Sequence, residues 1–291
     1  MAVPLDGTPE AESAVELAAA IATHWKASLN LLMTARAGAG VASGRLRGAA
    51  ASSGYLEALR SRLVTQTGVR ARALVLGGDA AIAERLVTHV RAHAVDLLVT
   101  TPWTGGFDGA PAARLCEWMP AAVLVVPERH PAARRPGNIL VTLDGTQSAE
   151  GILGFVTPLA KMLSGQLTLL TILAPSYVIG ASGSRGAQID CRVGPKRRMA
   201  RSYLDGVAER LRAEGHEVAT RVQVRGRAAG AIADFAMSEG FDLLAMSGSG
   251  RGSRNVVLPE VLRLLEGTTV ATLTHQPRES RLSRRLRPVE G

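Results

Sequence analysis

Two Asp-Gly-Thr triplets are the residues of this sequence best placed to do chemistry. Asp6-Gly7-Thr8 and Asp144-Gly145-Thr146 each follow a short apolar run and precede a stretch with helical periodicity. At such a turn the aspartate can hydrogen-bond the free amides of the next helix, or it can lie beside a bound ligand. The residue types allow both roles, so the role of each triplet depends on the elements that position it.

The triplets are part of an internal repeat, because the segments that follow them recur in the same order. Leu29-Asn30-Leu31-Leu32 recurs as Leu167-Thr168-Leu169-Leu170, at the 138-residue spacing of the triplets themselves. Later segments recur at spacings of 146 to 148 residues: Tyr55-Leu56 as Tyr203-Leu204, Gly78-Asp79-Ala80 as Gly226-Arg227-Ala228, and Asp96-Leu97-Leu98 as Asp242-Leu243-Leu244. A duplicated unit predicts two domains of the same fold.

Short apolar runs alternate with helical stretches in both copies. The runs lie at 2–5, 29–33, 71–76, 96–100 and 121–126, and again at 138–143, 166–173, 218–224, 242–247 and 269–274. The helical stretches lie at 9–25, 55–64 and 80–92, with counterparts near 203–214 and 229–238, and Thr8 and Pro9 are typical of an N-cap and a first helical position. This order predicts an α/β fold with two tandem doubly wound domains, each a five-stranded parallel sheet with helices on both faces.

The repeat also predicts where the domains end and where a ligand would bind. We expect one domain over 1–130, a second over 131–277 and a basic flexible tail over 278–291. The Gly/Ser/Ala-rich segments 37–53 and 175–198 are predicted to be long connections without regular structure. Ligands of doubly wound sheets bind beyond the carboxyl ends of the strands, so both triplets and the loops at 100–109 and 247–254 should open onto such crevices.

Composition excludes several classes of protein. The chain has 291 residues, 46% of them hydrophobic, and no apolar run approaches the roughly 18 to 20 residues that a membrane span needs. Its two cysteines lie in different copies, so a disulfide framework or a cysteine-based zinc site is not available. We therefore expect a soluble cytoplasmic protein with no membrane partner.

The formal net charge of +9 comes almost entirely from arginine. The clusters are Arg134-Arg135, Lys196-Arg197-Arg198 and the tail, which holds five arginines and two glutamates. We interpret them as solvated flexible segments. Because no set of aromatic residues for base stacking accompanies them, nucleic acid is an unlikely partner.

The sequence resembles the universal stress protein family in its tandem two-domain form. The resemblance rests on the two Asp-Gly-Thr turns, on the glycine turns after the third strands (78–80 and 226–228), on the Asp-Leu-Leu strands, and on the closing strand 120–126. It implies an adenine nucleotide alpha hydrolase-like fold and a non-enzymatic role in stress-response regulation. It also implies pairing of the two halves by pseudo-twofold symmetry through their fifth strands, and a homodimer.

The resemblance implies a site for ATP or another adenine nucleotide, with weak affinity and only in the second copy. The family's Gly-x2-Gly-x9-Gly-Ser/Thr pattern falls there on Ser247, Gly250, Glu260 and Val261, and in the first copy on Thr101, Thr104, Arg114 and Leu115. A carboxylate of Glu260 about 4 Å from a phosphate would cost about 4 kcal/mol per unit charge at an effective dielectric constant of about 20. The implied binding residues are Asp6, Asp144, Gly145, Ile172, Gly226, Ser247, Gly248, Gly250, Gly252 and Ser253.

Other chemistries are less well supported. No motif places a catalytic base or nucleophile, so we predict no catalytic residue, and ATP hydrolysis is the third choice after a nucleotide-binding regulator and a nucleotide-free interaction module with degenerate sites. His89 and His93 have the spacing of a metal-binding pair, but no third ligand is evident and we predict no metal site. Cys116 is expected to pack in the core rather than to react.

Overall fold

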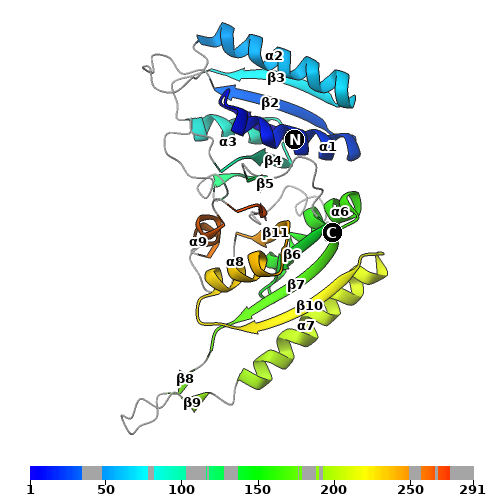
Figure 1. Cartoon of the computed structure of the whole chain (residues 1–291), viewed down its shortest axis with the longest axis vertical. Coiled ribbons are helices and arrows are strands. Elements are labelled where there is room, and N and C mark those ends of the chain that lie inside the picture. Colours follow the sequence, from blue (N-terminus) through cyan, green and yellow to red (C-terminus); the bar gives the residue numbers. More distant parts are fainter. Residues whose placement is uncertain are drawn as a thin grey trace, which may run out of the picture.

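The computed structural model describes residues 1–34, 48–77, 82–102, 116, 118–127, 137–175, 177–178, 188–189, 193–248, 257–265 and 268–275. Within them, ten strands form one sheet in the order β10-β7-β6-β11-β12-β5-β4-β1-β2-β3 (Figure 1). The strands of the first half are β1 (Ala2–Leu5), β2 (Ser28–Thr34), β3 (Arg70–Leu76), β4 (Leu97–Thr100) and β5 (Ala122–Val125). Those of the second half are β6 (Asn138–Thr142), β7 (Gln166–Leu173), β10 (Val218–Val224), β11 (Leu243–Ser247) and β12 (Ala271–His275).

Each half is a parallel five-stranded unit, as the sequence predicts. In the ten-stranded sheet, every pairing within a half is parallel, and the pairing between the halves, β5 with β12, is antiparallel. The central strands are buried on both faces, which explains why their sequences are continuous apolar runs rather than alternating ones.

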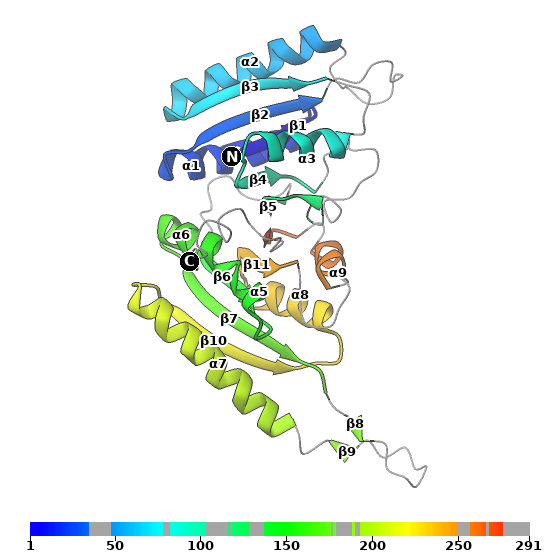
Figure 2. The ribbon, with the colours of Figure 1, turned by 180° about the vertical axis from the view of Figure 1, so that it is seen from behind.

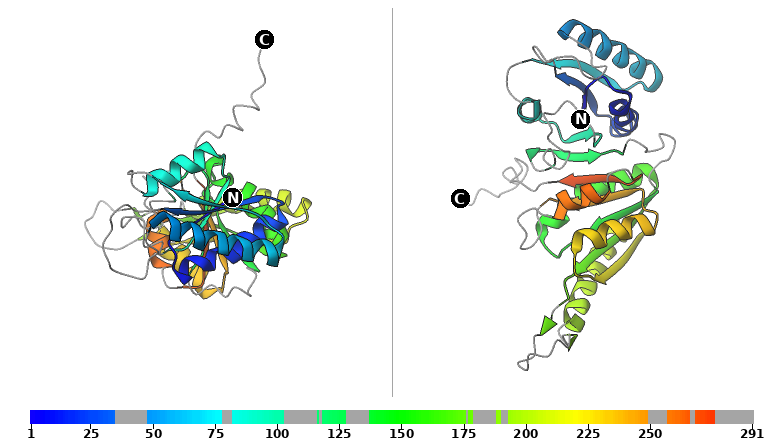
Figure 3. Two further views of the ribbon diagram at one scale, coloured as in Figure 1. Left: turned by 90° about the horizontal axis from the view of Figure 1, so that it is seen from above. Right: turned by 60° about the vertical axis from the view of Figure 1, so that its left-hand side comes forward.

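Helices cover both faces of the sheet (Figure 2). The first half has α1 (Pro9–His24), α2 (Gly48–Thr67) and α3 (Ile82–Ala92), and the second has α5 (Gln147–Glu150), α6 (Leu153–Leu163), α7 (Val193–Ala213), α8 (Ala228–Ser238) and α9 (Val257–Leu264). One apolar core joins one sheet face to α1, α2, α6 and α7, and a second core joins the other face to α3, α8 and α9. Both cores contain residues of both halves, so the apolar interior continues from one half into the other. Figure 3 shows the strands of the two halves following one another in one sheet.

The start of α1 follows directly from its sequence. Thr8 has an extended backbone, and its hydroxyl accepts a hydrogen bond from the amide of Ala11. Pro9 occupies the first turn, where its missing amide proton costs nothing. Thr8 is therefore confirmed as the N-cap and Pro9 as a first-turn residue.

The two predicted long connections are shorter than the sequence suggests. Helix α2 begins at Gly48 and α7 at Val193, so 48–53 and 193–198 are helical, and a short hairpin of β8 (Tyr177–Val178) and β9 (Gln188–Ile189) lies between β7 and α7. The prediction that Lys196-Arg197-Arg198 is unstructured is therefore wrong. The alanines of 49–51 favour helix, and Pro195 stands in the first turn of α7, where proline is tolerated.

The two halves meet at β5 and β12. Leu124 pairs with Leu273, and both side chains are 1% exposed. Cys116 is buried in the core that contains α3, α8 and α9, and burial raises the pKa of its thiol to about 11, which agrees with a packing role. Among the described residues, no helix is long and apolar enough to cross a membrane.

Candidate functional site: the carboxyl ends of the second-half strands

The Asp-Gly-Thr corner of the second half joins β6 to α5. One carboxylate oxygen of Asp144 accepts hydrogen bonds from the amide of Thr146 at 3.0 Å and from its hydroxyl at 2.6 Å. The Thr146 hydroxyl in turn accepts from the amide of Ala149 at 3.2 Å, as an N-cap does. Gly145 has φ of 83°, a conformation that residues with a side chain rarely adopt, so the glycine makes the turn possible.

The first half repeats this corner closely. Asp6 accepts from the amide and the hydroxyl of Thr8 at 3.0 and 2.6 Å, and Gly7 has φ of 85°. Asp6 and Asp144 therefore share one structural role, which is to orient the threonine that caps the next helix. A structural role of the two aspartates is supported in both halves, although it is the threonine and not the aspartate that accepts from an amide of the helix.

A second group of interacting residues that is repeated in both halves was not predicted from the sequence. In the second half Tyr203 of α7 donates to Glu150 of α5 at 3.0 Å, and Arg210 contacts the other carboxylate oxygen at 2.6 Å. In the first half Tyr55 and Arg62 of α2 hold Glu12 of α1 at 2.8 and 2.6 Å. The signal was present in the sequence, because the glutamates are separated by 138 residues, and the tyrosines and arginines by 148.

This Tyr–Glu–Arg triad is partly buried and lies near the aspartate of the same half. Burial, followed by the hydrogen bond to Glu150, raises the pKa of Tyr203 above its ordinary value, and Asp144 adds to the shift in the same direction. The pKa of Tyr55 is raised for the same reasons, which are burial, the hydrogen bond to Glu12 and the charge of Asp6. Both phenols therefore stay protonated and serve as hydrogen-bond donors at neutral pH.

The other wall of the predicted crevice is the end of β11. Ser247 is the last residue of this strand, and the amide of Gly248 donates to the carbonyl of His275 at 3.0 Å. The ring of His275 packs at a tilt against Phe155 with ring centroids 4.7 Å apart, and its Nδ1 atom is buried with no partner among the described residues. Burial lowers the pKa of His275, so the ring is neutral at neutral pH.

The sheet order decides which predicted binding residues come together. Strand β6 lies between β7 and β11, so Asp144, Ile172 and Ser247 are at the carboxyl ends of three adjacent strands. The crossovers after β6 and β10 go to opposite faces, which makes this the switch point of the half. The remaining predicted residues Gly250, Gly252 and Ser253 lie outside the described residues.

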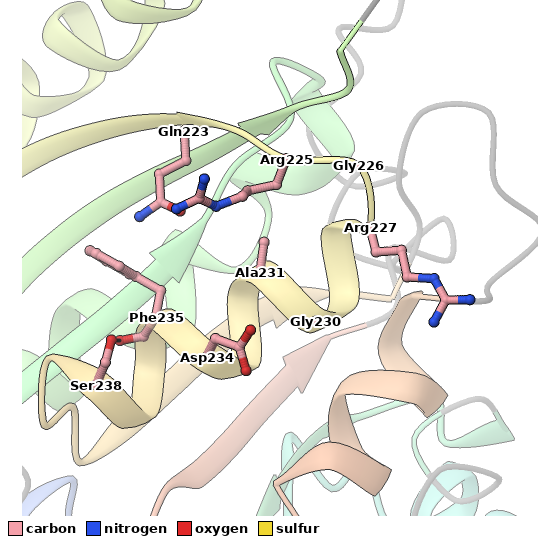
Figure 4. A pocket seen from close by; sticks show the side chains of 9 residues that line it. All are labelled: Gln223, Arg225, Gly226, Arg227, Gly230, Ala231, Asp234, Phe235 and Ser238. Carbon is pink, nitrogen blue, oxygen red and sulfur yellow. Dashed lines mark hydrogen bonds between the residues drawn. The ribbon is translucent and has the colours of Figure 1, made fainter.

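Gly226 lies further out, beside a groove between β10 and α8 (Figure 4). The groove has a volume of about 390 Å³ and is lined by Gln223, Arg225, Gly226, Arg227, Gly230, Ala231, Asp234, Phe235 and Ser238. Gln223 pairs with Ile172 in the sheet, so the groove borders the predicted crevice. In the first half, Arg85 occupies the helix position of Ala231 and donates to the carbonyl of Leu76.

The last two positions of the glycine pattern do not form a phosphate site of the usual kind. Glu260 is in the first turn of α9, where a carboxylate favours the helix, and Val261 is fully buried in the core. Val261 therefore cannot contact a ligand in this conformation. Elsewhere, His89 and His93 stack with centroids 4.1 Å apart, and the described residues contain no group of three or more potential metal ligands.

A model of the universal stress protein family matches residues 136–265. Residues 136–265 are therefore similar to the universal stress protein domain. The match covers β6 to α9 and includes both walls of the crevice described above. No curated protein matches the sequence.

Solved structures that resemble the whole chain show that the universal stress protein fold extends over both halves. A universal stress protein from Archaeoglobus fulgidus has a TM-score of 0.62 at 13% identity, with 96% of each chain covered. A functionally unknown protein from Pseudomonas aeruginosa has a TM-score of 0.63 at 14% identity, with 95% of this chain and 92% of that chain covered. The cytoplasmic domain of a prokaryotic cation chloride cotransporter has a TM-score of 0.57 at 14% identity, with 94% and 93% covered.

Proposed function

We propose that the chain is a tandem universal stress protein, a non-enzymatic regulatory module whose second half binds an adenine nucleotide weakly. We place the first domain at 1–130, the second at 131–277 and a basic tail at 278–291. The proposal assigns cytoplasmic location, and it assigns the nucleotide to the crevice between the ends of β6 and β11.

The observation that carries the proposal is the asymmetry of this crevice between the halves. In the second half β11 continues through Ser247 into Gly248, whereas the equivalent residues after β4 are Thr101 and Pro102. Thr101 is 1% exposed whereas Ser247 is partly exposed, and the ring of Pro102 stands where the second half has a glycine, so the first half offers no small residue beside the backbone there. Small residues let a phosphate approach the backbone closely, and this supports the second half as the binding half.

The proposed contacts use the residues at the crevice. Asp144 and Gly145 form the corner on one side, and Ile172 stands at the end of β7, where the family places the adenine. We assign Ser247 and Gly248 to the phosphate side, and with them Gly250, Gly252 and Ser253, which lie outside the described residues. Gly226 would contribute from the rim of the groove, and Asp6 is the matching corner residue in the first half.

A titration with a fluorescent ATP analogue tests the proposal, with Asp144→Ala and Asp6→Ala as matched variants. Each substitution removes the same pair of hydrogen bonds to a capping threonine, so both should lower stability to a similar extent. Saturable binding that is lost in Asp144→Ala and kept in Asp6→Ala is the expected result. Equal affinities of the two variants for the analogue would show that the nucleotide does not bind in this crevice.

A nucleotide-free interaction module is the second candidate function, and the identical corners favour it. Asp6 and Asp144 make the same bonds although only the second half keeps a glycine of the family's binding pattern, Gly250, so these bonds do not depend on a ligand site. The two candidates differ in thermal unfolding. A bound nucleotide increases the free energy of unfolding by RT ln(1 + [L]/Kd), so the melting temperature rises with the nucleotide concentration. An interaction module shows no such response.

The antiparallel β5–β12 pairing supports a pseudo-twofold arrangement of the two domains. Both strands have a neighbour on each side in the sheet, so a homodimer would have to form through another surface. Light scattering over a range of protein concentrations tests whether such a dimer exists.

A further inference from the structure

In the first half, two side chains close the place that corresponds to the groove between β10 and α8. Leu76 of β3 packs against the core that contains α3, α8 and α9, and Arg85 of α3 donates a hydrogen bond to the carbonyl of Leu76 at 2.9 Å. The Nε atom of Arg85 is buried. The arginine side chain therefore spans the space between the strand and the helix.

The second half has Gln223 and Ala231 at these two positions. Gln223 corresponds to Leu76, because their partners in β7 and β2 have the 138-residue spacing of the repeat. Ala231 corresponds to Arg85, because α8 and α3 both have 11 residues and begin at the 146-residue spacing of the Asp-Leu-Leu strands. Alanine has no atoms beyond Cβ and cannot reach the strand, so a groove of about 390 Å³ stays open.

Four side chains that line the groove are polar or charged and have no hydrogen-bond or ion-pair partner among the described residues: Gln223, Arg225, Arg227 and Asp234. Figure 4 shows Gln223 and Arg225 reaching from the β10 side toward α8, whereas Arg227 points away from them. Arg225 and Asp234 therefore bring opposite charges to one groove from its two bounding elements, and they do not pair with each other. Such an arrangement is complementary to a ligand that carries both charges.

The groove also has an apolar wall. Phe235 of α8 is half-buried and points toward β10 (Figure 4), whereas the equivalent residue of α3, His89, is buried. The ring of Phe235 packs at a tilt against Phe241 with ring centroids 5.6 Å apart, which holds it in place. Ala231 lies one turn earlier on the same side of the helix and is too short to cover the ring. An apolar group of a ligand can therefore lie against Phe235.

We propose that this groove binds a free amino acid with an apolar side chain. The guanidinium of Arg225 holds the carboxylate of the ligand with two hydrogen bonds, and the carboxylate of Asp234 holds its ammonium group. The amide of Gln223 donates to or accepts from the same polar groups, and Phe235 contacts the apolar side chain.

The size of the groove agrees with a ligand of this kind. A volume of about 390 Å³ is near the lower end of the range of about 300–1,000 Å³ for small-molecule sites, and a few polar groups on an apolar wall are typical of them. The site shares no side chain with the corner of Asp144, so it does not rest on the proposed nucleotide binding.

Isothermal titration calorimetry of the full chain with L-phenylalanine, L-leucine and L-methionine tests the proposal. At least one of them should bind with saturation at one site per chain. Analogues of that amino acid without the ammonium or without the carboxylate, such as 3-phenylpropanoate and 2-phenylethylamine for phenylalanine, should bind at least about tenfold more weakly. Absence of saturable binding of all three amino acids would overturn the proposal. An analogue that binds as tightly as the amino acid would also overturn it, because the groove would then not recognise both charges.

Variants of the chain locate the binding. Ala231→Arg introduces the residue that closes the first half and should abolish it. Arg225→Gln and Asp234→Asn each remove one charge from the groove and should lower the affinity at least about tenfold. The matched controls Arg221→Gln and Glu239→Gln change exposed residues of β10 and of the end of α8 that do not line the groove. They should change the affinity less than about twofold.

Two results with these variants would overturn the proposal. One is undiminished binding by Ala231→Arg. The other is an equal loss in the charge variants and in their controls, which would indicate that net charge decides the binding. Thermal unfolding of Ala231→Arg near the temperature of the parent chain shows that a loss of binding is not a loss of the fold. If this variant does not fold, the exposed substitutions Arg225→Gln and Asp234→Asn still decide the outcome.

Discussion

The phenol of Tyr203 donates a hydrogen bond to the carboxylate of Glu150 at 3.0 Å, and it links two helices that are about 50 residues apart in the chain. The first half contains the same bond between Tyr55 and Glu12, at 2.8 Å. In both halves an arginine two turns further along the helix holds the second carboxylate oxygen. A duplicated polar clamp therefore fastens the first helix of each half to its neighbour.

Removing one phenol should weaken the clamp. Tyr203→Phe leaves the partly buried carboxylate of Glu150 with the exposed Arg210 as its partner, and we expect the free energy of unfolding to fall by about 1–2 kcal/mol. Urea denaturation measures the change. Tyr55→Phe should have a similar effect, and the two should add, because the clamps are in different halves. A loss below about 0.5 kcal/mol in both variants would show that the clamp contributes little.

The capping threonines give a second prediction. Thr146→Ala removes the oxygen that accepts from the amide of Ala149, and Thr8→Ala removes the equivalent acceptor for Ala11. Each substitution should cost about 1 kcal/mol of stability. Serine at either position keeps the hydroxyl and should retain most of the stability. If the alanine and serine variants were equally destabilised, the hydroxyl would not be the capping group.

His89 gives a prediction about pH. Burial, with a smaller contribution from His93, lowers the pKa of His89, and its Nε2 atom has no partner among the described residues. The unfolded chain therefore takes up the proton more readily than the folded one, so this part of the stability is complete above about pH 6.5 and is lost as the pH falls below it. The equivalent residue of α8 is Phe235.

His89→Phe should therefore make the fall in melting temperature between about pH 7 and pH 5 less steep. His24→Gln, at the exposed end of α1, serves as the control for the loss of one histidine. Calorimetry at a series of pH values provides the measurement. A slope that is the same in His89→Phe and in the parent chain would mean that His89 is not a group that titrates on acid unfolding.

The last prediction concerns the β5–β12 pairing that joins the two halves. Leu124 and Leu273 oppose each other in the β5–β12 pairing and belong to the same core, so each alanine substitution should cost about 2–5 kcal/mol. The double variant should lose less than the sum, with a coupling of about 0.5–3 kcal/mol. Leu29→Ala, in β2 and four strands away from β12, should add to Leu273→Ala without coupling.

Elements with a clear signal in the local sequence were predicted correctly. The ten sheet strands fall on the predicted apolar runs to within one or two residues, and Thr8 caps α1 as expected. The starts of α2 and α7 were missed because a Gly/Ala run and a basic run have weak periodicity, and packing against β3 and β10 stabilises these helices. The clamp of Glu150 and Tyr203 was missed because its partners come from different helices.

The sequence by itself determined the duplicated parallel units and the two capped corners, because these depend on apolar periodicity and on hydrogen bonds between residues close in the chain. The tertiary structure decided the continuous ten-stranded sheet, the burial of Val261 and the contact of Tyr203 with Glu150. These features join residues that are far apart in the chain. Which of them meet depends on the order of the strands and the face each helix covers, and no local pattern records either.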